Sequence, residues 1–360
     1  MKNTVFLSMF LLLTNICFCS QLKLIKTIPI DEGALFVPMS FVVLEEGSLL
    51  FTDIRDKDHQ FKIFNEKGQL IKAWGKMGPG PDEFGGLGFL DYLSPYLAVA
   101  DAGKHRVHIF EKLQNYELKK IGEILSWEMD NQIKIYEKSV LICGNVVSPK
   151  GRKYVLFERN FNEQKTNYVL PLEYSYGTAS IREYEKVAEE VSGLSGLAFL
   201  DVYQDTAFYV SNVRLRVARI NLKSRKIDFF GKQTKNFRPL TIDKKTRYEM
   251  MQIGTGKKII EELLSNYSFV SGIFADNNLI GVIYVNREKK IGNDFYFIPY
   301  VQFYDYSGNL QYEQKLPEVI GEDRVTRIFY QKNLRHLYFL SIVSGESSYR
   351  CTIYKYAIEP

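Results

Sequence analysis

Short apolar runs that alternate with polar positions recur along most of the chain, and turn residues separate them. One set, SLLFTDIRDKDHQFKIFNEKGQLIKAWG, begins at Ser48, and another, YLAVADAGKHRVHIFEKLQNYELKKIG, begins at Tyr96. Each contains an apolar run that ends in aspartate, a polar turn, a second run, a tight turn and a third run. Alternation of this kind between turns predicts antiparallel β-strands joined in chain order.

The same order of strands returns in the rest of the chain. It begins again at Ser139, Thr206, Leu279 and His336, and a further apolar strand precedes each unit, as in VPMSFVVLEEG. About four strands in each of about six units are typical of a β-propeller. The sequence therefore predicts an all-β fold, a six-bladed β-propeller of four-stranded antiparallel blades, in a single domain over residues 21–360.

The two ends of this region predict how the ring closes. The unit that begins at His336 stops after its second strand, whereas QLKLIKTIPI opens the region with a spare strand. Pairing residues 21–30 beside residues 351–358 would leave no open blade edge at the seam. An open sandwich is the alternative, and similar units with a spare strand at the opposite end favour closure.

A stretch rich in glycine and proline, GKMGPGPDEFGG at Gly75–Gly86, separates the first two units. A phosphate-binding loop would need its lysine later than Lys76, and Pro79 and Pro81 lack the amide donors that a dinucleotide loop offers. The stretch is therefore interpreted as the crossing from one blade to the next. Its glycines permit positive φ, and Phe84 is expected to plug the space between two blades.

The residues GPGPDEFGGLGFLDY and LAVADAGKHRVHIFE resemble NHL-type repeats, in which a G-x-G-P-G-x-F loop precedes a strand and an aspartate closes the next. The region as a whole is similar to the TolB-like propellers with six blades that Bacteroidota export in large numbers. The match is good in the first two units and diffuse from Ser139 onward. The resemblance implies the fold and says little about function, because one fold hosts many functions.

In an up-and-down blade, the turn between the second and third strands lies at the same end as the crossing to the next blade. We call this end the crossing face; it carries the long segments 75–86, 145–153 and 286–299. The opposite end is the short-turn face, with the turns LEEGS, EKGQ, KLQN, LKSRK and YSGN. Elaborated loops on a rigid scaffold are where binding usually occurs, so the crossing face is the predicted binding face.

Two crossings carry helical patterns, Ser180–Gly193 and Asp243–Tyr267, and we expect these short helical inserts to wall one side of the binding face. The apolar stripe of the first insert is Ile181, Tyr184, Ala188 and Val191, and that of the second is Ile260, Leu263, Leu264 and Tyr267. The expected contacts with a partner are Tyr184, Tyr248, Met251 and Tyr267.

The other candidate ligand-binding residues each end a strand at the crossing face: Asp53, Asp101, Asn145, Asn212 and Asn286. Propeller lactonases gather such side chains around a central calcium, which prefers oxygen ligands. Alternatively, Asp and Asn cap the turn after the strand by accepting hydrogen bonds from its amides. We favour capping, because calcium sites in that family lie nearer the axis, where the sequence offers only Asp91, Asp201 and Asp276.

Other chemistry is sparse. The chain has no G-x-S-x-G and no H-E-x-x-H motif. His105 and His108 point to opposite faces of a strand at this spacing, so they are not expected to bind a metal together. Cys143 and Cys351 lie in apolar strands, where buried free thiols are more common, and they could form a disulfide only as spatial neighbours. No catalytic residue, metal ligand or cofactor is therefore predicted.

Residues 1–20 have the pattern of a secretory signal peptide. Lys2 precedes an apolar core from Val5 to Leu13, and Cys17-Phe18-Cys19 resembles a cleavage site. A lipid anchor on Cys17 or Cys19 is the alternative, and no other apolar run is long enough for a transmembrane span. A net charge of +5, from 47 basic and 42 acidic residues, is too small over 360 residues to indicate a nucleic-acid partner.

The sequence thus indicates an exported protein that is periplasmic, outer-membrane associated or secreted. We expect it to be non-catalytic and to bind a protein or glycan of the cell envelope through the crossing face. The alternative is a metal-dependent propeller enzyme of the lactonase or lyase type, with calcium at the axis. Such an enzyme needs several carboxylates or histidines that converge on the axis.

Overall fold

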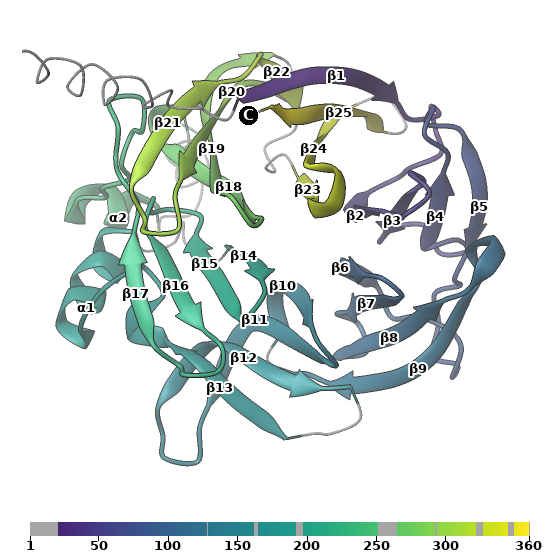
Figure 1. The fold of residues 1–360 in the computed structure, drawn as a ribbon, viewed down its shortest axis with the longest axis horizontal. Helices are drawn as coiled ribbons and strands as arrows, with labels where there is room; N and C mark the ends of the chain where they lie inside the picture. The colour runs from purple at the N-terminus through teal and green to yellow at the C-terminus, as the bar shows by residue number, and fades with distance from the viewer. Residues whose placement is uncertain are drawn as a thin grey trace, which may run out of the picture.

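The computed structural model describes residues 21–127, 129–161, 165–191, 197–250, 265–291, 294–321, 327–344 and 349–359. Its strands form six antiparallel sheets, each built on four strands in up-and-down order, that surround one axis as blades (Figure 1). The prediction of a six-bladed β-propeller is therefore confirmed.

Each blade runs from an inner strand at the axis to an outer strand at the rim, and we number the blades in chain order of their inner strands. Blade 1 is β2 (Pro38–Val43), β3 (Leu49–Asp53), β4 (Phe61–Phe64) and β5 (Leu70–Trp74). Blade 2 is β6 (Leu87–Leu93), β7 (Tyr96–Asp101), β8 (Arg106–Lys112) and β9 (Leu118–Leu125). Blade 3 is β10 (Met129–Tyr136), β11 (Ser139–Val147), β12 (Lys153–Asn160) and β13 (Thr166–Pro171).

The second half of the ring follows the same plan with one addition. Blade 4 is β14 (Ala198–Tyr203), β15 (Thr206–Ser211), β16 (Val217–Asn221) and β17 (Ile227–Phe230). Blade 5 is β18 (Ser268–Ala275), β19 (Ile280–Ile291), β20 (Asp294–Tyr304) and β21 (Leu310–Lys315), and β22 (Val319–Gly321) pairs with the extended part of β20. Blade 6 is β23 (Arg327–Gln331), β24 (His336–Ser344), β25 (Tyr349–Glu359) and β1 (Gln21–Pro29).

Blade 6 contains both ends of the described chain. Strand β1 pairs antiparallel with β25, in a register that sets Gln21 opposite Glu359 and Ile28 opposite Ile353 (Figure 1). Leu22 and Ile28 are buried, and the amide of Leu22 donates to the side chain of Gln314 in blade 5. The N-terminal strand therefore closes the ring as predicted.

The core lies between adjacent blades, because each sheet buries both of its faces against its neighbours. Between blades 1 and 2, for example, Phe61 and Leu97 belong to one buried cluster. Cys143 and Cys351 are buried in blades 3 and 6, and no disulfide joins them. The expectation of buried thiols rather than a disulfide is confirmed.

Helix α1 (Ile181–Glu190) occupies the crossing between blades 3 and 4. The hydroxyl of Ser180 caps its first turn by accepting from the amide of Glu183, which is typical of helix starts. The helix packs Val187 and the following Val191 against Val213, Leu240 and Ile242. Ile181 is 56% exposed, so its prediction as a buried stripe residue is wrong; the stripe starts at Tyr184 and includes Val187 instead.

Helix α2 (Lys244–Met250) lies in the crossing between blades 4 and 5, at the same side of the ring as α1 (Figure 1). Asp243 caps it by accepting from the amide of Thr246. The second half of this insert, with Ile260, Leu263 and Leu264, lies outside the described residues. In the part of the chain that is described, no helix has the length and apolar character needed to cross a membrane.

Candidate functional site

On the crossing face, Asp53 and Asp101 hold the entry loops of their blades. The buried carboxylate of Asp53 accepts from the amides of Phe36 and Val37 at 2.7 and 2.8 Å, and from Lys62 Nζ at 2.9 Å. Both side chains serve as turn caps, which supports the capping interpretation over a metal site.

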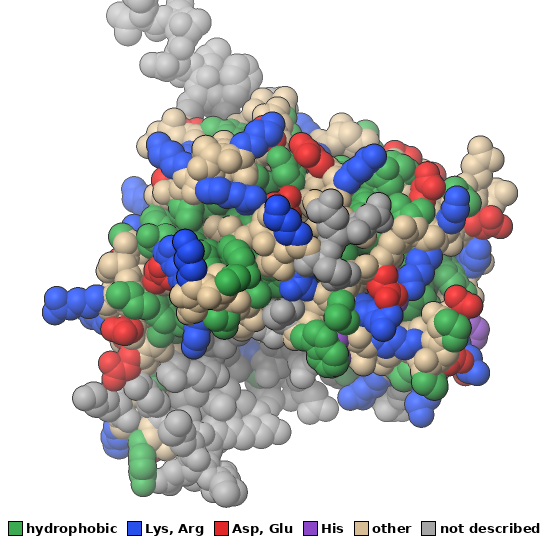
Figure 2. Space-filling model, turned by 90° about the horizontal axis from the view of Figure 1, so that it is seen from below, with side chains coloured by type: hydrophobic (Ala, Val, Ile, Leu, Met, Phe, Trp, Pro, Cys, Tyr) green, Lys and Arg blue, Asp and Glu red, His purple; other side chains and the backbone are tan. Residues whose placement is uncertain are grey.

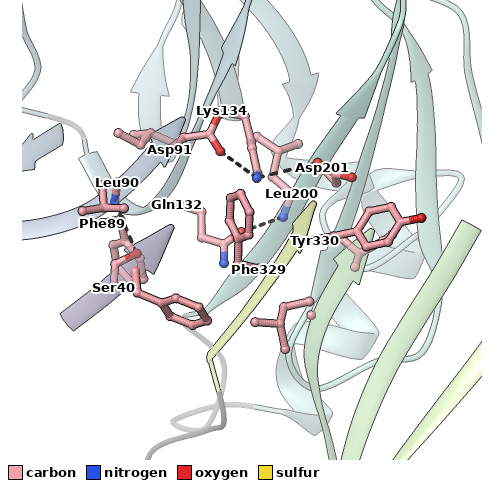
Figure 3. Close-up of a pocket in the computed structure, with 15 residues that line it drawn as sticks. Ser40, Phe89, Leu90, Asp91, Gln132, Lys134, Leu200, Asp201, Phe329 and Tyr330 are labelled. Carbon is pink, nitrogen blue, oxygen red and sulfur yellow. Dashed lines mark hydrogen bonds and ion pairs between the residues drawn. The ribbon is translucent and has the colours of Figure 1, made fainter. Parts of the chain in front are cut away.

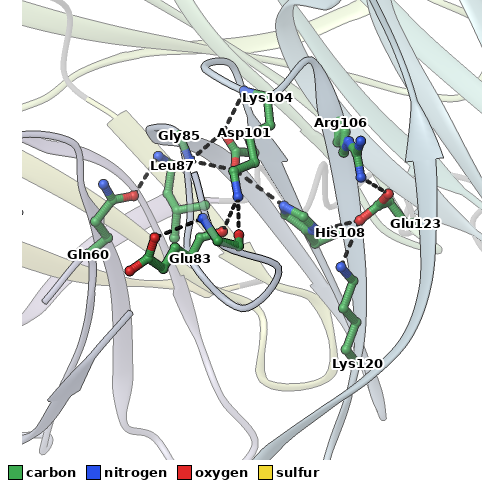
Figure 4. Close-up of polar contacts among 11 residues, drawn as sticks. Gln60, Glu83, Gly85, Leu87, Asp101, Lys104, Arg106, His108, Lys120 and Glu123 are labelled. Carbon is green, nitrogen blue, oxygen red and sulfur yellow. Dashed lines mark hydrogen bonds and ion pairs between the residues drawn. The ribbon is translucent and has the colours of Figure 1, made fainter. Parts of the chain in front are cut away.

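Asp101 in blade 2 likewise accepts hydrogen bonds from main-chain amides, here those of the loop that follows β5 and of its own turn (Figure 4). Its carboxylate accepts from the amide of Gly85 at 2.9 Å and from that of Lys104 at 3.0 Å, and lies 3.3 Å from His108 Nε2. Burial raises the pKa of Asp101, but the hydrogen bonds from His108, Gly85 and Lys104 outweigh it, so the pKa lies below its ordinary value.

The same loop requires two glycines and an aromatic plug. A Cβ on Gly85 would lie 2.6 Å from the carbonyl carbon of Gly103, so neither residue can carry a side chain without moving backbone. Phe84 packs edge-on against Phe61 of blade 1 and His108 of blade 2, with ring centroids 5.3 and 5.4 Å apart. The predicted plug between blades is confirmed, and His105 turns away to stack on Trp127.

The three asparagines of the predicted set lie in blades 3 to 5. Asn145 is exposed, whereas Asn212 and Asn286 are buried. Asn286 contacts the hydroxyl of Ser268 and donates to the carbonyl of Asn236 at 3.0 Å. Each of the five polar candidates belongs to a different blade, and no described hydrogen bond joins two of them.

The predicted aromatic contacts pack around α1 rather than around a cavity. Tyr184 stacks on Tyr176 with centroids 5.5 Å apart, and the hydroxyl of Tyr267 donates to the carbonyl of Thr241 at 2.9 Å. Tyr248, on α2, is 67% exposed. Met251 lies outside the described residues.

A different set of polar side chains meets at the axis, near the short-turn face (Figure 3). Strands β6, β10 and β14 contribute Asp91, Lys134 and Asp201. Lys134 Nζ lies 2.8 Å from Asp91 Oδ1 and 3.7 Å from Asp201 Oδ1. The other carboxylate oxygens accept from the amides of Ile135 and Ala275, both at 2.8 Å, so each carboxylate also joins its blade to the next.

Blades 5 and 6 extend this cluster. Lys332 Nζ, just after β23, lies 3.1 Å from Asp201 Oδ1 and also donates to the carbonyl of Val202. Asp276, just after β18, accepts from the hydroxyl of Tyr330 and from Arg335 Nε at 3.2 Å. Three carboxylates thus face three cationic side chains, and we call these six residues the axial charge cluster: Asp91, Lys134, Asp201, Asp276, Lys332 and Arg335.

The protonation of the cluster follows from its geometry. Burial alone would lower the pKa of Lys134, but the charges of Asp91 and Asp201 outweigh it and raise the pKa. Lys134 is therefore an ammonium ion at neutral pH. Burial, and then the hydrogen bond to Asp276, raise the pKa of Tyr330, which stays a neutral phenol.

Two cavities adjoin the cluster. A small one of about 50 Å³ lies between the inner strands and is bounded by Ser40, Gln132 and Leu200, among others (Figure 3). A larger one of about 590 Å³ opens at the short-turn face, and we call it the short-turn pocket. Asp91, Lys134, Asp201, Phe329 and Tyr330 border both cavities, so these three charged residues of the cluster lie at the floor of the larger one.

The turns between first and second strands form the walls of the short-turn pocket. They come from blades 1, 2, 3, 4 and 6 and include carboxylates, amides, tyrosines and a lysine: Glu45, Tyr92, Tyr136, Glu137, Tyr203, Gln204, Asp205, Gln331, Lys332 and Asn333. A cavity of this size, in which apolar and aromatic side chains are joined by converging polar groups, is typical of a ligand site.

The residues at the axis do not fit a calcium ion. Calcium takes six to eight oxygen ligands, whereas the inward carboxylate oxygens of Asp91 and Asp201 already bind the ammonium groups of Lys134 and Lys332. A divalent cation would have to displace two positive charges. Among the described residues, no group of three or more His, Cys, Asp or Glu side chains is arranged to hold a metal.

The short-turn pocket was not predicted from the sequence. The three acidic residues near the axis were identified, but their lysine and arginine partners come from other blades and from turns. A usable signal existed: Asp91 and Asp201 are charged residues within otherwise apolar inner strands, and Lys134 stands between two isoleucines of β10. Charged side chains at such positions indicate either an ion pair or a site.

No protein-family model and no curated protein matches the chain. Among solved structures, a candidate exported protein of Bacteroides fragilis is similar, with a TM-score of 0.57, 12% identity, and coverage of 94% of this chain and 96% of that chain. A candidate gluconolactonase (TM-score 0.48, 10% identity, 95% and 94% covered) and a candidate 6-phosphogluconolactonase of Bacteroides fragilis (0.37, 11%, 86% and 81%) are more distant.

The similarity to the exported protein, with its TM-score of 0.57, shows the fold only. The sheets and the site define a class: a six-bladed β-propeller with a ligand-sized pocket at one end of its axis. The resemblance to NHL-type and TolB-like propellers stays a prediction, because it has no matching family model.

Proposed function

We propose that this protein is an exported propeller that binds a ligand in the short-turn pocket and does not transform it with a metal. The observation that carries the proposal is the charge-compensated floor beneath a cavity of about 590 Å³. Each ammonium group of the floor is paired with a carboxylate. The floor is therefore a rigid, polar surface that can contact a ligand. Partners on the crossing face, a protein or glycan, remain a separate prediction.

The similarity to an exported protein of Bacteroides fragilis supports the export part of the proposal, together with the pattern of residues 1–20. The metal-dependent alternative would have to begin from the carboxylates of the axial charge cluster. Their ammonium partners disfavour it, because a bound cation there is repelled by neighbouring positive charge.

The experiment is a ligand screen by saturation-transfer NMR with four classes of probe: amines, neutral sugars, sugar acids and sugar lactones. Each hit is repeated with Tyr203→Ala, in the wall of the short-turn pocket, and with Tyr184→Ala, on the crossing face. We expect at least one class to bind and to be lost only with Tyr203→Ala. Binding lost only with Tyr184→Ala would contradict the proposal.

The lactone probes also test the enzyme alternative. We expect their hydrolysis rate, with and without added calcium, to equal the spontaneous rate. Hydrolysis that needs calcium and disappears with Asp91→Asn would replace the binding proposal by the enzyme.

On the surface drawn in Figure 2, basic and acidic side chains are interleaved, which is the ordinary arrangement of a solvated surface. That side of the molecule therefore offers no field of one sign to attract a partner. The lining of the short-turn pocket differs from that surface, because its carboxylates outnumber its ammonium groups.

A further inference from the structure

Three turns place carboxylates around the rim of the short-turn pocket. Glu45 comes from the turn after β2, Glu137 from the turn after β10, and Asp205 from the turn after β14. Asp205 accepts from the hydroxyl of Tyr136 at 2.8 Å and pairs with Lys223 at 2.6 Å. Glu45 and Glu137 form no salt bridge with any described residue.

The floor does not offset this charge. Lys134 and Lys332 are the two ammonium groups of the lining, and Asp91 and Asp201 already pair with them. The lining therefore has five carboxylates and two ammonium groups, and Lys223 outside it pairs with Asp205, so the excess negative charge comes from Glu45 and Glu137. A cleft with charge of one sign and low-dielectric walls concentrates counter-ions, here cations, and repels anions.

Tyrosines stand between the acidic rim and the floor. Tyr136 and Tyr203 end the inner strands β10 and β14, Tyr92 is the last residue but one of β6, and each is only partly buried. The hydrogen bond from Tyr136 to Asp205 joins blades 3 and 4 and fixes the ring of Tyr136 at the wall. The electron-rich faces of such rings attract ammonium groups, most strongly where water is partly excluded.

We infer that the short-turn pocket takes an organic cation, a ligand with an alkylammonium group that the tyrosines and rim carboxylates surround. The inference rests on the proposed function, since it names the ligand class of the same pocket. The positive charge of the ligand is essential to the inference. A neutral molecule of the same shape should therefore bind less well, and a sugar acid should not bind.

The test compares choline with 3,3-dimethylbutan-1-ol, which has the same shape without the charge, and with gluconate as the anion. Dissociation constants for the full mature chain are measured by NMR titration at low and at high salt. We expect choline to bind about tenfold more tightly than its neutral isostere, and gluconate not to bind. The choline affinity should weaken as salt rises, because salt screens the rim charge.

Two variants test which carboxylates contribute to the affinity for choline. The double substitution Glu45→Gln and Glu137→Gln removes two exposed rim charges without touching the buried floor, so folding is not at risk. It should weaken choline several-fold, whereas Glu185→Gln, an exposed carboxylate on α1, should leave it unchanged.

Equal binding of choline and its isostere, tighter binding of gluconate, or no measurable choline binding at millimolar concentration overturns the cation inference. If a neutral sugar or a sugar acid from the screen still depends on Tyr203, the pocket stands as the binding site and only its ligand class is wrong. If no probe depends on Tyr203, the proposed function itself fails.

Discussion

The two ends of the propeller axis use aspartate in different ways. On the crossing face, Asp53 and Asp101 accept from main-chain amides and hold the loops that enter blades 1 and 2. Near the short-turn face, Asp91 and Asp201 bind side-chain ammonium groups beneath an open pocket. The comparison teaches that elaborate loops need their polar residues for their own structure, whereas short turns leave the axis open above a set of paired charges.

The largest loss of stability is expected from opening the ring of blades, which supports both ends of the axis. Beginning the mature chain at Glu32 removes β1, and with it the burial of Leu22 and Ile28 and the pairing to β25. The free energy of unfolding should fall by more than about 4 kcal/mol, from two buried apolar side chains and a row of hydrogen bonds. Urea unfolding measures it, with Lys23→Ala as a control that keeps the strand. A truncated chain as stable as the full one contradicts closure by β1.

A glycine on each face sharpens the comparison of loops. Gly103→Ala places a Cβ against the backbone of Gly85 and should cost about 3 kcal/mol by overpacking. Gly47→Ala, in a turn of the short-turn face, has no atom within 4 Å of its Cβ but has a φ of +86°, so strain of about 1 kcal/mol is expected. Thermal unfolding compares the two variants. A larger loss of stability for Gly47→Ala than for Gly103→Ala would mean that Gly103 is not tightly packed against Gly85.

The ion pairs of Lys134 near the short-turn face should also contribute to stability. Lys134→Met leaves Asp91 and Asp201 without the ammonium that they share, and the partial exposure of the site limits the cost to about 2 kcal/mol. Adding Asp91→Asn should recover part of that loss, since it removes the charge that is left uncompensated, whereas Asp201 keeps its ion pair with Lys332. A double variant less stable than Lys134→Met would show that the carboxylate acts independently of the ammonium.

The pH dependence of the crossing face has a definite sign. The pKa of Asp101 is depressed below 3.8, so its contribution to stability is present above that pH and disappears as pH falls through the folded-state pKa. Asp101→Asn should therefore cost about 2 kcal/mol at neutral pH, and the difference from the native chain should shrink as the pH falls below 3.8 and through the folded-state pKa. Ligand binding in the short-turn pocket should not change. Urea unfolding across this pH range gives the first result and NMR titration the second.

The sequence predicted the parts of the fold that depend on local pattern. The apolar runs Leu49–Asp53 and Tyr96–Asp101, bounded by turn residues, indicate strands, and the spare strand Gln21–Pro29 indicates the closure. Phe84 could be placed because it is the one aromatic side chain of its loop, among glycines and prolines. The phase of α1 was predicted less well, because Ile181 in its first turn is exposed.

The pocket could not be predicted in the same way. Lys332 is distant in sequence from Asp201, yet the ring sets them 3.1 Å apart. Loop length suggested the crossing face, because length is visible in a sequence and an open axial mouth is not. The acidic residues of the turns, such as Glu45, Glu137 and Asp205, were visible but looked like ordinary turn residues.

The central claim is that ligand binds at the short-turn face. It can be tested with a reactive cysteine at each candidate site, Asn333→Cys in the lining of the short-turn pocket and Tyr248→Cys at an exposed position of α2. Cys143 and Cys351 are buried, and burial raises the pKa of Cys143, so the native thiols should react slowly. The rate of maleimide alkylation is measured with and without choline, or with the tightest ligand of the screen. Slower alkylation at residue 333 alone is the predicted result, and slower alkylation at residue 248 alone would contradict the account.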